Sequence, residues 1–360
     1  MDISKIDMHL AQGKVDNDIK WTNCLDEPFS LHGVFYNQKE NLFVRVPQEV
    51  VEETGNPSLE ILSRMTSGGR IRFVTDSDFI AIKASLPALS PAPNLPITLS
   101  HGFSVYADGK FRNRYSPVFK DFTKVEEFEN FRNKIYFAEK KVIADTKKER
   151  LVEVYFPLYG GVSELYIGVS EDAVIKQAPE YKLTKPMVFY GSSITQGASV
   201  SRPGNDYVSM IAQRFNSDYI NLGFSGNGNA EDAMIDYVNS IDASLYAFDY
   251  NYYPSKKDRV LPPHFSIYQR IREKHPDAVI LMYDKPGCDY EPCKEREEMI
   301  FASYKKALEL GDTKVCYVSP WELFGEGDRD CCMVDVSHPN DLGAIRMTNS
   351  ICSVIDTFFK

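Results

Sequence analysis

The 360-residue sequence has no excess of basic residues and no long apolar run. Its 41 Lys and Arg are outnumbered by 51 Asp and Glu, which leaves a net charge of −10 with histidine neutral. Nucleic acids and anionic membrane surfaces are bound through basic patches, so this balance argues against both as partners. No apolar segment approaches the roughly 20 residues of a membrane-spanning helix, and residues 1–5 lack the apolar core of a signal peptide. We therefore expect a cytoplasmic protein.

Cysteine is scarce and shows no regular spacing. The seven cysteines are Cys24, Cys288, Cys293, Cys316, Cys331, Cys332 and Cys352. A disulfide framework would need an even number at regular spacing, so we expect free thiols. Zinc sites use Cys-x2-Cys pairs or closely spaced histidines, and neither accompanies Cys288, Cys293 or the adjacent Cys331 and Cys332. The sequence therefore predicts no metal site.

Segments typical of strands fill the first half of the chain. Short apolar or alternating stretches, separated by turn residues, predict strands at 31–36, 42–46, 70–74, 79–84, 104–107, 111–115, 134–138, 151–158 and 163–169. One helix is predicted at 47–64, and four prolines predict a loop at 85–96. The first two strands should form a hairpin, and the last two should be joined around Gly160 and Gly161. Many short strands with little helix indicate a β-sandwich.

From residue 181 onward, strands alternate with longer helices. The predicted strands are 187–190, 219–222, 245–249, 279–283 and 315–318, and the predicted helices are 207–215, 232–240, 265–274, 295–310 and 341–359. Alternation of this length indicates a parallel sheet with helices on both faces. We therefore predict an α/β protein of two domains, a β-sandwich over residues 1–180 and a domain with a five-stranded parallel sheet over residues 181–360.

The sequence Gly191-Ser192-Ser193-Ile194-Thr195 directly follows the first strand of the second half. Side chains there lie at the carboxyl edge of a parallel sheet, where open α/β sheets keep their sites. The turn lacks the lysine of a P-loop, the glycine order of a dinucleotide-binding loop and the last glycine of a Gly-x-Ser-x-Gly elbow. It is either a helix-capping turn or the site of a nucleophile, for which Ser193 is the candidate.

A base for Ser193 is offered by the sequence Asp335-Val336-Ser337-His338-Pro339. A serine hydroxyl becomes a good nucleophile when a base takes its proton and a third group holds that base in one tautomer. Asp335 and His338 are three residues apart and can meet across one turn. Pro339 restricts the backbone of His338 and suits the start of the helix predicted at 341–359. The alternative is a capped helix with a surface histidine.

Two further loops follow neighbouring strands and could donate hydrogen bonds to an oxyanion. The glycine-rich stretch 221–228 follows the second strand, and its glycines would let backbone N–H groups approach a ligand. Asn251 follows the third strand and carries a side-chain amide. A flexible turn and an ordinary turn asparagine are the alternatives.

Four features of the second half resemble, in the same chain order, the four blocks of the SGNH (GDSL-type) hydrolases. These features are Ser193, the glycine-rich stretch, Asn251 and the Asp335-x-x-His338 pair. The resemblance covers residues 187–360. It implies a flavodoxin-like sheet, no cofactor, and hydrolysis of esters or thioesters. It also implies that Ser193 is the nucleophile, His338 the base and Asp335 the carboxylate that orients the base. The oxyanion hole would be the N–H groups of Ser193 and Gly226 together with the side chain of Asn251.

The first half carries a weaker resemblance. Residues 161–168, Gly-Val-Ser-Glu-Leu-Tyr-Ile-Gly, are similar, with an offset of one residue, to the Gly-x-Asp/Glu-Leu-Tyr stretch of two-domain members of this family. This implies the subgroup with an N-terminal, jelly-roll-like β-sandwich. Two departures from the family pattern change the pocket. Ser192 stands where the first block has aspartate, and Asp249 and Tyr252 stand where the third block has glycine and aspartate.

We expect from the resemblance an esterase that removes a short acyl group, acetyl above all, with carbohydrate esters among its substrates. Tyr252, Tyr253 and Trp321 are candidate substrate-binding residues, because sugar rings lie on aromatic faces; packing of these rings in the core is the alternative. The other interpretation is a carbohydrate-binding protein whose hydrolase half is catalytically silent. The sequence leaves the oligomeric state open.

Overall fold

The computed structural model of the protein describes residues 15–87, 92–117, 135–249, 264–286 and 291–359. Its N-terminal half is built from two antiparallel sheets. The first has the strand order β1 (Ile19–Asn23), β11 (Glu164–Ser170), β6 (Phe79–Leu86) and β9 (Ile135–Val142). The second has the order β12 (Ile175–Lys176), β5 (Arg70–Thr75), β10 (Arg150–Tyr155), β7 (Phe103–Ala107) and β8 (Lys110–Tyr115), and β2 (Ser30–His32) also pairs with β5.

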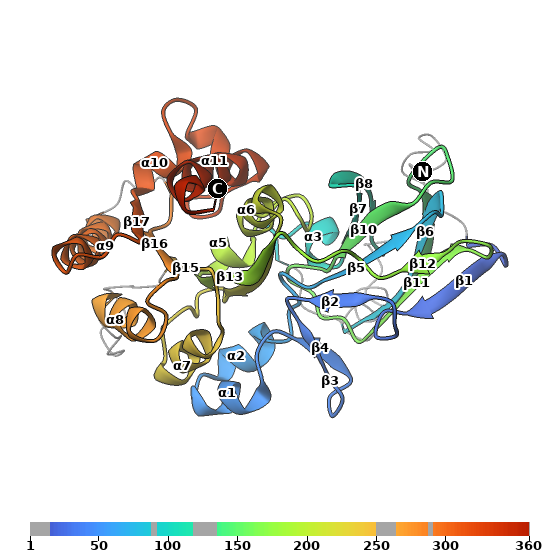
Figure 1. Ribbon diagram of the computed structural model, residues 1–360, viewed down its shortest axis with the longest axis horizontal. Helices are drawn as coiled ribbons and strands as arrows, with labels where there is room; N and C mark the ends of the chain where they lie inside the picture. Colours follow the sequence, from blue (N-terminus) through green and yellow to red (C-terminus); the bar gives the residue numbers. More distant parts are fainter. Residues whose placement is uncertain (1–14, 88–91, 118–134, 250–263, 287–290, 360) are drawn as a thin grey trace.

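The two sheets pack face to face around a shared apolar core. Alternate residues of each strand point inward, as a strand period of two requires. The core contains Ile71 and Phe73 of β5, Ile80 and Ile82 of β6, and Ile167 of β11, all fully buried. The predicted β-sandwich is therefore confirmed, and Figure 1 shows it on the right of the molecule.

Two local predictions for this half were wrong. Only β3 (Phe35–Asn37) and β4 (Leu42–Val44) form the first hairpin, because β2 pairs with β5 instead. The helix predicted at 47–64 is two short helices, α1 (Gln48–Glu53) and α2 (Pro57–Leu62), broken where Gly55 adopts a φ of +64° before Asn56 caps α2. The last two predicted strands, β10 and β11, are joined around Gly160 and Gly161 as expected, and this connection crosses from one sheet to the other.

The C-terminal half contains a five-stranded parallel sheet. Its strand order is β14 (Ser217–Gly223), β13 (Leu183–Gly191), β15 (Leu245–Asp249), β16 (Val279–Tyr283) and β17 (Val315–Val318). The chain therefore starts in β13, moves outward to β14 and returns past β13 to β15. This flavodoxin-like order creates a switch point between β13 and β15, where open sheets bind ligands at the carboxyl ends of their strands. The predicted fold class is confirmed.

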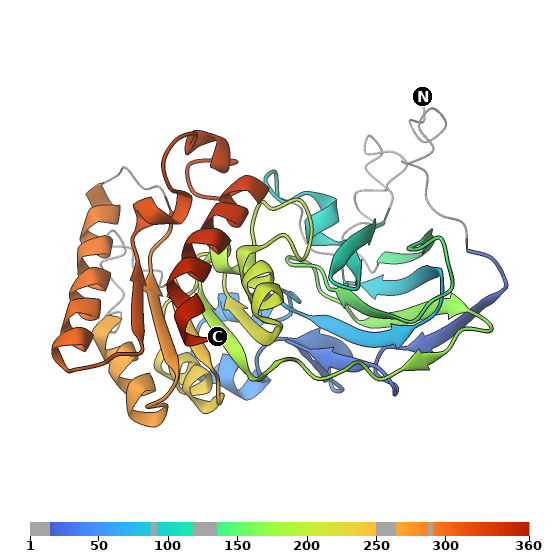
Figure 2. The same ribbon diagram turned by 45° about the horizontal axis from the view of Figure 1, so that its top comes forward.

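Helices cover both faces of the parallel sheet, because successive residues of each strand point to opposite faces. Phe189 belongs to the apolar core under α6 (Tyr207–Phe215) and α11 (Asp341–Ile355). Its neighbours Val188 and Tyr190 belong to the core under α7 (Asp232–Ser240), α8 (His264–Lys274) and α9 (Glu291–Glu309). Figure 2 shows α11 running across the first face, with α9 at the far side of the sheet. Among the described residues, no helix is long and apolar enough to span a bilayer.

The two halves share one continuous apolar core. Leu99, which lies in the short helix α3 (Ile97–Ser100), and Leu158 belong to the same buried cluster as Phe189 and Ile194 of the second half. On the other face of the sheet, α1 packs against α7. The chain passes from one half to the other between β12 and β13, and a domain boundary at residues 180 and 181 stays a prediction.

The buried guanidinium of Arg45 also joins the two halves. Arg45, just after β4, is 1% exposed. It donates hydrogen bonds to the carbonyl oxygens of Leu62 (2.7 Å) and Met65 (2.6 Å) in the first half, and of Asn221 (3.0 Å) and Gly223 (2.7 Å) in the second. Burial lowers the pKa of Arg45 to about 9, which leaves the group charged at neutral pH. Carbonyl oxygens, rather than a carboxylate, therefore solvate this charge.

We predict that Arg45→Ala destabilises the protein by about 3–5 kcal/mol, because four buried carbonyl oxygens lose their donor at once. The free energy of unfolding in urea measures this cost. Arg64→Ala is the matched control, since Arg64 is 36% exposed and pairs with Glu40 at 2.9 Å. Its removal should cost no more than about 1 kcal/mol. Equal losses in the two variants would contradict the role given to Arg45.

Candidate active site

The turn after β13 places Ser193 at the first position of a one-turn helix, α5 (Ser193–Gln196). The sequence predicted only a polar turn here. Ser192 caps the helix, because its hydroxyl accepts a hydrogen bond from the N–H of Ile194 at 3.1 Å, and Gly197 ends it with a φ of +98°. The N–H groups of a first helical turn have no partner inside the helix. The backbone N–H of Ser193 is therefore available to a ligand at the carboxyl edge of the sheet.

Ser193, His338 and Asp335 form a continuous line of hydrogen bonds. The Ser193 Oγ lies 3.0 Å from the His338 Nε2. On the other side of the ring, the His338 Nδ1 lies 2.8 Å from Oδ2 and 3.0 Å from Oδ1 of Asp335. The structure thus brings together the three residues that the sequence proposed, although 145 positions separate the serine from the histidine.

The loop before α11 holds the carboxylate in place. The Asp335 Oδ1 accepts hydrogen bonds from the backbone N–H groups of Ser337 (2.7 Å) and His338 (2.8 Å). Partial burial acts to raise the pKa of Asp335, but these bonds and the one from the imidazole outweigh it, so the pKa lies below its usual value. Asp335 therefore stays ionised across the neutral range. The helix α11 is capped by Asn340. Pro339 lies just before this cap, outside the helix, and forms an isolated β-bridge with Met333.

A second carboxylate holds the turn that carries Ser193. Asp249 is the last residue of β15 and is 3% exposed. Its Oδ2 accepts hydrogen bonds from the hydroxyl of Ser192 and from the hydroxyl of Thr195, the latter at 3.1 Å. The N–H of Ser192 lies 3.4 Å from the same oxygen. Residues on both sides of Ser193 are thus tied to the neighbouring strand.

The donors and acceptors in the hydrogen-bond chain that starts at Asp249 can be assigned in only one way. Thr195 has a single hydroxyl hydrogen, and it points to Asp249. The Tyr207 hydroxyl, 2.8 Å from Thr195, must therefore donate to it, and the Tyr283 hydroxyl, 2.6 Å further on, must donate to Tyr207. Burial, together with the nearby Asp249 carboxylate, raises the pKa of both phenols and keeps them protonated as donors.

The two departures noted in the sequence at Ser192 and Asp249 therefore lie at one contact. The family pattern has a carboxylate at the position of Ser192 and a glycine at that of Asp249, and here the two side chains contact each other. Gly191 and Asp249 are Cα partners across β13 and β15. Only the sheet order reveals this, since the pairing of two predicted strands cannot be read from either strand alone.

The glycine-rich loop after β14 lies against the turn after β13. The N–H of Phe224 donates to the carbonyl of Gly191 at 2.8 Å. A Cβ on Gly223 would lie 2.1 Å from the backbone nitrogen of Gln196, so only glycine allows this approach. Gly226, the predicted oxyanion donor, has a φ of +64° and open space where a Cβ would be.

The predicted substrate-binding residues are only partly described. Asn251, Tyr252 and Tyr253 lie outside the described residues. Trp321 lies in α10 (Pro320–Phe324), is 36% exposed, and its ring faces the guanidinium of Arg329 at 4.9 Å. The described contacts of Trp321 therefore place it beside Arg329 and do not bring it to Ser193.

Residues of the N-terminal half contact the turn that carries Ser193 and also contact Asp335. The sequence alone did not indicate them. The Tyr159 hydroxyl donates to the carbonyl of Ser193 at 3.3 Å, and the Ser67 hydroxyl donates to the carbonyl of Gln196 at 2.7 Å. The Asn94 side chain reaches Asp335. No local pattern marks these residues, because each contact spans more than 30 positions in the chain.

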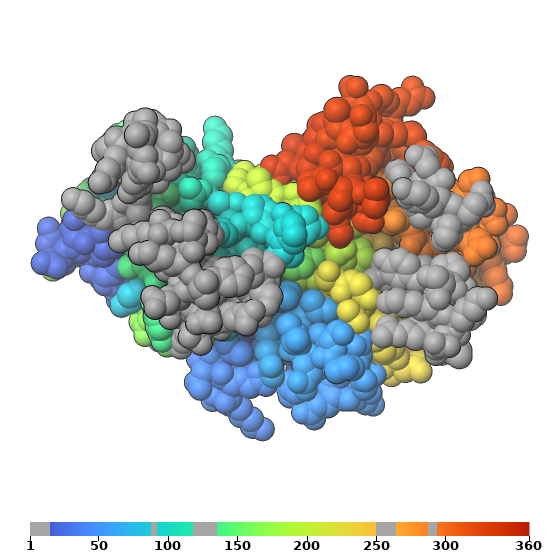
Figure 3. Space-filling view, turned by 180° about the vertical axis from the view of Figure 1, so that it is seen from behind, coloured from blue at the N-terminus to red at the C-terminus, as the bar shows by residue number. Residues whose placement is uncertain are grey.

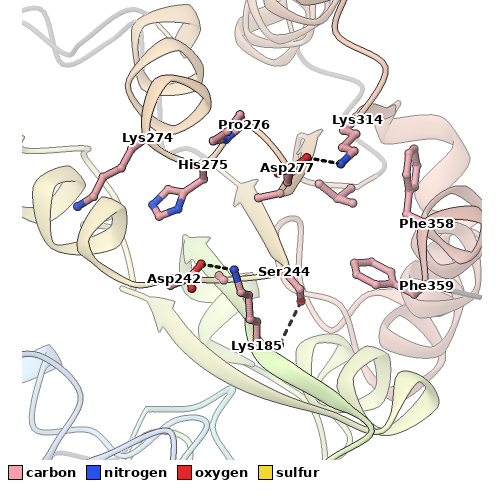
Figure 4. A pocket seen from close by; sticks show the side chains of 13 residues that line it. Lys185, Asp242, Ser244, Lys274, His275, Pro276, Asp277, Lys314, Phe358 and Phe359 are labelled. Carbon is pink, nitrogen blue, oxygen red and sulfur yellow. Dashed lines mark hydrogen bonds and ion pairs between the residues drawn. The ribbon is translucent and has the colours of Figure 1, made fainter.

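The cavity drawn in Figure 4 lies at the opposite edge of the parallel sheet. Most of its lining residues precede strands β15, β16 and β17 or lie near the start of β13, and Phe358 and Phe359 follow α11. Two of its lysines are already paired, Lys185 with Asp242 and Lys314 with Asp277, each at 2.8 Å. In the described part of the chain, no group of three His, Cys, Asp or Glu side chains could hold a metal ion.

Comparisons with known families cover nearly all of the chain. Residues 184–356 match the GDSL-like lipase/acylhydrolase family. Residues 19–175 match the family described as the N-terminus of SGNH_hydro-type esterases, whose short name is GxDLY. A comparison with curated proteins finds no match.

Solved structures show the same two-part fold. A GDSL-like lipase from Bacteroides ovatus is 26% identical, with a TM-score of 0.76 over 94% of this chain and 97% of that chain. A salicylyl-acyltransferase from a tetracycline biosynthetic pathway is 17% identical, with a TM-score of 0.73 over 96% and 98%. An acetyl xylan esterase from Butyrivibrio proteoclasticus is 12% identical, with a TM-score of 0.54 over 93% and 97%. The last two similarities concern the fold alone.

We predict that the Asp249 and Ser192 side chains stabilise the protein as a coupled pair. Asp249→Ala should lower the free energy of unfolding by about 2–4 kcal/mol, because two buried hydroxyl groups lose their acceptor. In a double-mutant cycle with Ser192→Ala, the coupling should be at least about 1 kcal/mol. The control cycle pairs Asp249→Ala with Ser240→Ala, at the exposed end of α7, and should be additive. Additive effects in both cycles would contradict this coupling.

Proposed function

Because the chain belongs to the GDSL-like lipase/acylhydrolase family and is an ester hydrolase, we propose that it is a serine esterase whose nucleophile is Ser193. The observation that supports this most directly is the line of hydrogen bonds from Ser193 through His338 to Asp335. A nucleophile within hydrogen-bond reach of a base, which is itself oriented by a carboxylate, is the arrangement that serine hydrolases use.

In the proposed reaction, Ser193 Oγ attacks the ester carbonyl carbon while His338 Nε2 takes the hydroxyl proton. Asp335 Oδ2 keeps the Nδ1–H of the ring pointing away from the serine and stabilises the imidazolium that forms. The tetrahedral intermediate collapses when His338 returns the proton to the leaving alcohol, and an acyl group remains on Ser193. Water then attacks the acyl-enzyme by the same steps, and the free acid leaves.

The developing oxyanion would be stabilised by the N–H of Ser193 and that of Gly226. The Ser193 N–H lies in the first turn of α5, where N–H groups point out of the helix. Gly226 lies on the loop that packs against this turn, with open space beside its Cα. Asn251, which follows β15 in sequence, is proposed as the third donor.

An active enzyme is better supported than a silent carbohydrate-binding protein. A silent hydrolase half would have no reason to keep the serine and the carboxylate each within 3.0 Å of the imidazole. The buried side chain of Asp249 also favours an active enzyme, because it holds Ser192 and Thr195 and so restrains the turn on both sides of Ser193.

We propose a short acyl group on a polar alcohol as the substrate. Asn227 and the backbone of Gly226 form part of the loop beside Ser193 and are polar and half-buried. An acetyl xylan esterase shares the fold, which supports a carbohydrate ester without identifying one. Tyr252, Tyr253 and Trp321 remain the proposed residues for a sugar ring.

We predict that Ser193→Ala lowers kcat on p-nitrophenyl acetate by roughly 10⁵–10⁶-fold, because no other group can form the acyl-enzyme. The variant should also lose labelling by a fluorophosphonate probe. Ser199→Ala is the control: Ser199 is buried on the next loop, and its hydroxyl has no hydrogen-bond partner among the described residues. Its activity should stay within about twofold of the parent. Substantial activity in Ser193→Ala would disprove the assignment of the nucleophile.

We also predict that acetyl esters are cleaved faster than octanoyl esters of the same alcohol. A site for a long chain would bury methylene groups in an apolar groove, which favours binding by about 0.8 kcal/mol for each one. The described loop beside Ser193 offers polar groups instead. The measurement is kcat/KM for the two-, four- and eight-carbon p-nitrophenyl esters, with Ser193→Ala as the background. A rise with chain length would contradict the short-acyl proposal and leave Ser193 in its role.

A further inference from the structure

The N-terminal half contributes a side chain to the proposed triad. Asn94 lies between β6 and α3 and is half-buried. Its Nδ2 donates a hydrogen bond to Oδ2 of Asp335 at 3.3 Å and lies 3.4 Å from Nδ1 of His338. Asp335 is 241 residues further along the chain. The contact therefore exists only because the two halves are packed together.

The segment that carries Asn94 is fixed to the C-terminal half at several points. The side chain of Leu95 packs against the shared apolar core, and Leu99 is fully buried within it. The Thr98 hydroxyl donates to the carbonyl of Ser201 at 2.5 Å, and the N–H of Ser201 donates to Asp341 at 2.8 Å. In Figure 3 the cyan surface around residue 100 lies beside the red-orange surface of the chain before α11. Asn94 is thus held next to Asp335.

The chemistry of the carboxylate fixes which way the Asn94 amide points. An amide oxygen 3.3 Å from Asp335 Oδ2 would face a negative charge, whereas the NH2 group can donate to it. With this donor, each carboxylate oxygen has its partners: Oδ1 accepts from two backbone N–H groups, and Oδ2 accepts from the imidazole and from Asn94. The side chain of Asp335 is 40% exposed, so without Asn94 the Oδ2 atom would keep only the imidazole as its protein partner and would otherwise face water.

We propose that Asn94 is a positioning residue of the esterase, which acts through Asp335 to hold the His338 ring toward Ser193. The inference rests on the proposed function of these three residues. It means that the N-terminal half completes the catalytic group as well as supporting the fold. Asn94 touches no reacting atom, so its effect should fall on kcat rather than on substrate binding.

The test compares Asn94→Ala with Thr98→Val in the full-length protein, with p-nitrophenyl acetate as substrate. Asn94→Ala should lower kcat roughly 3- to 30-fold, with KM within about twofold of the parent, because a hydrogen bond to the charged carboxylate is lost. Thr98→Val loosens the same segment without touching Asp335, and its kcat should stay within about twofold of the parent. An equal loss in both variants would mean that Asn94 only joins the two halves, and would overturn the proposal.

The pH profile tests independently whether the side chain at position 94 faces the Asp335–His338 pair. Asn94→Asp keeps the shape of the side chain but sets a negative charge against the Asp335–His338 pair, which favours the protonated imidazole. The acid limb of kcat/KM should therefore move to higher pH by at least about 0.5 unit. Besides Asp335, Lys285 after β16 acts electrostatically on this region, and it is unchanged in every variant. An acid limb that does not move would overturn the proposal.

Two controls separate this inference from the proposed function. If Ser193→Ala keeps its activity, the proposed nucleophile is wrong, and the role of Asn94 fails with it. If Ser193→Ala is inactive while Asn94→Ala matches the parent in kcat and in its acid limb, only the role of Asn94 is overturned. Loss of kcat at unchanged KM in Asn94→Ala, with a shifted limb in Asn94→Asp and a normal Thr98→Val, supports the inference.

Discussion

The buried carboxylate of Asp249 is the interaction on which the arrangement at the sheet edge depends. It is nearly excluded from solvent, and it accepts hydrogen bonds from residues on both sides of Ser193. A buried carboxylate is costly unless its oxygens are well hydrogen-bonded. The turn after β13 must therefore keep its hydroxyl groups directed at β15, and the same turn sets the position of Ser193 and of its backbone N–H.

The location of this carboxylate differs from the family pattern, while its chemistry is kept. In the family pattern a carboxylate belongs to the turn itself, whereas here it comes from the neighbouring strand and the turn supplies the hydroxyl. Carboxylates at both positions would put two negative charges in contact, and these would repel each other. The hydroxyl groups of Tyr207 and Tyr283 extend the chain of hydrogen-bond donors that begins at Thr195 and stabilises the Asp249 carboxylate.

The N-terminal half surrounds the proposed site rather than standing apart from it. Arg45 holds the strand before the glycine-rich loop, Tyr159 contacts the carbonyl of Ser193, and Asn94 contacts Asp335. These three contacts come from different segments of the sandwich half and reach different parts of the site. A change at the interface between the halves would therefore reach the geometry of the proposed site.

The sequence alone determined the features that depend on local periodicity and short spacing. Several helices and strands, such as those at 207–215, 245–249 and 315–318, have the predicted bounds, because apolar residues repeat at intervals set by the helix or by the buried strand. The contact between Asp335 and His338 could also be anticipated, since one turn brings them together. Only the tertiary structure decided that Ser192 and Asp249 are partners and that Arg45 and Asn94 reach the second half. Such contacts depend on strand order and on the packing of distant segments, and neither leaves a signal in the local sequence.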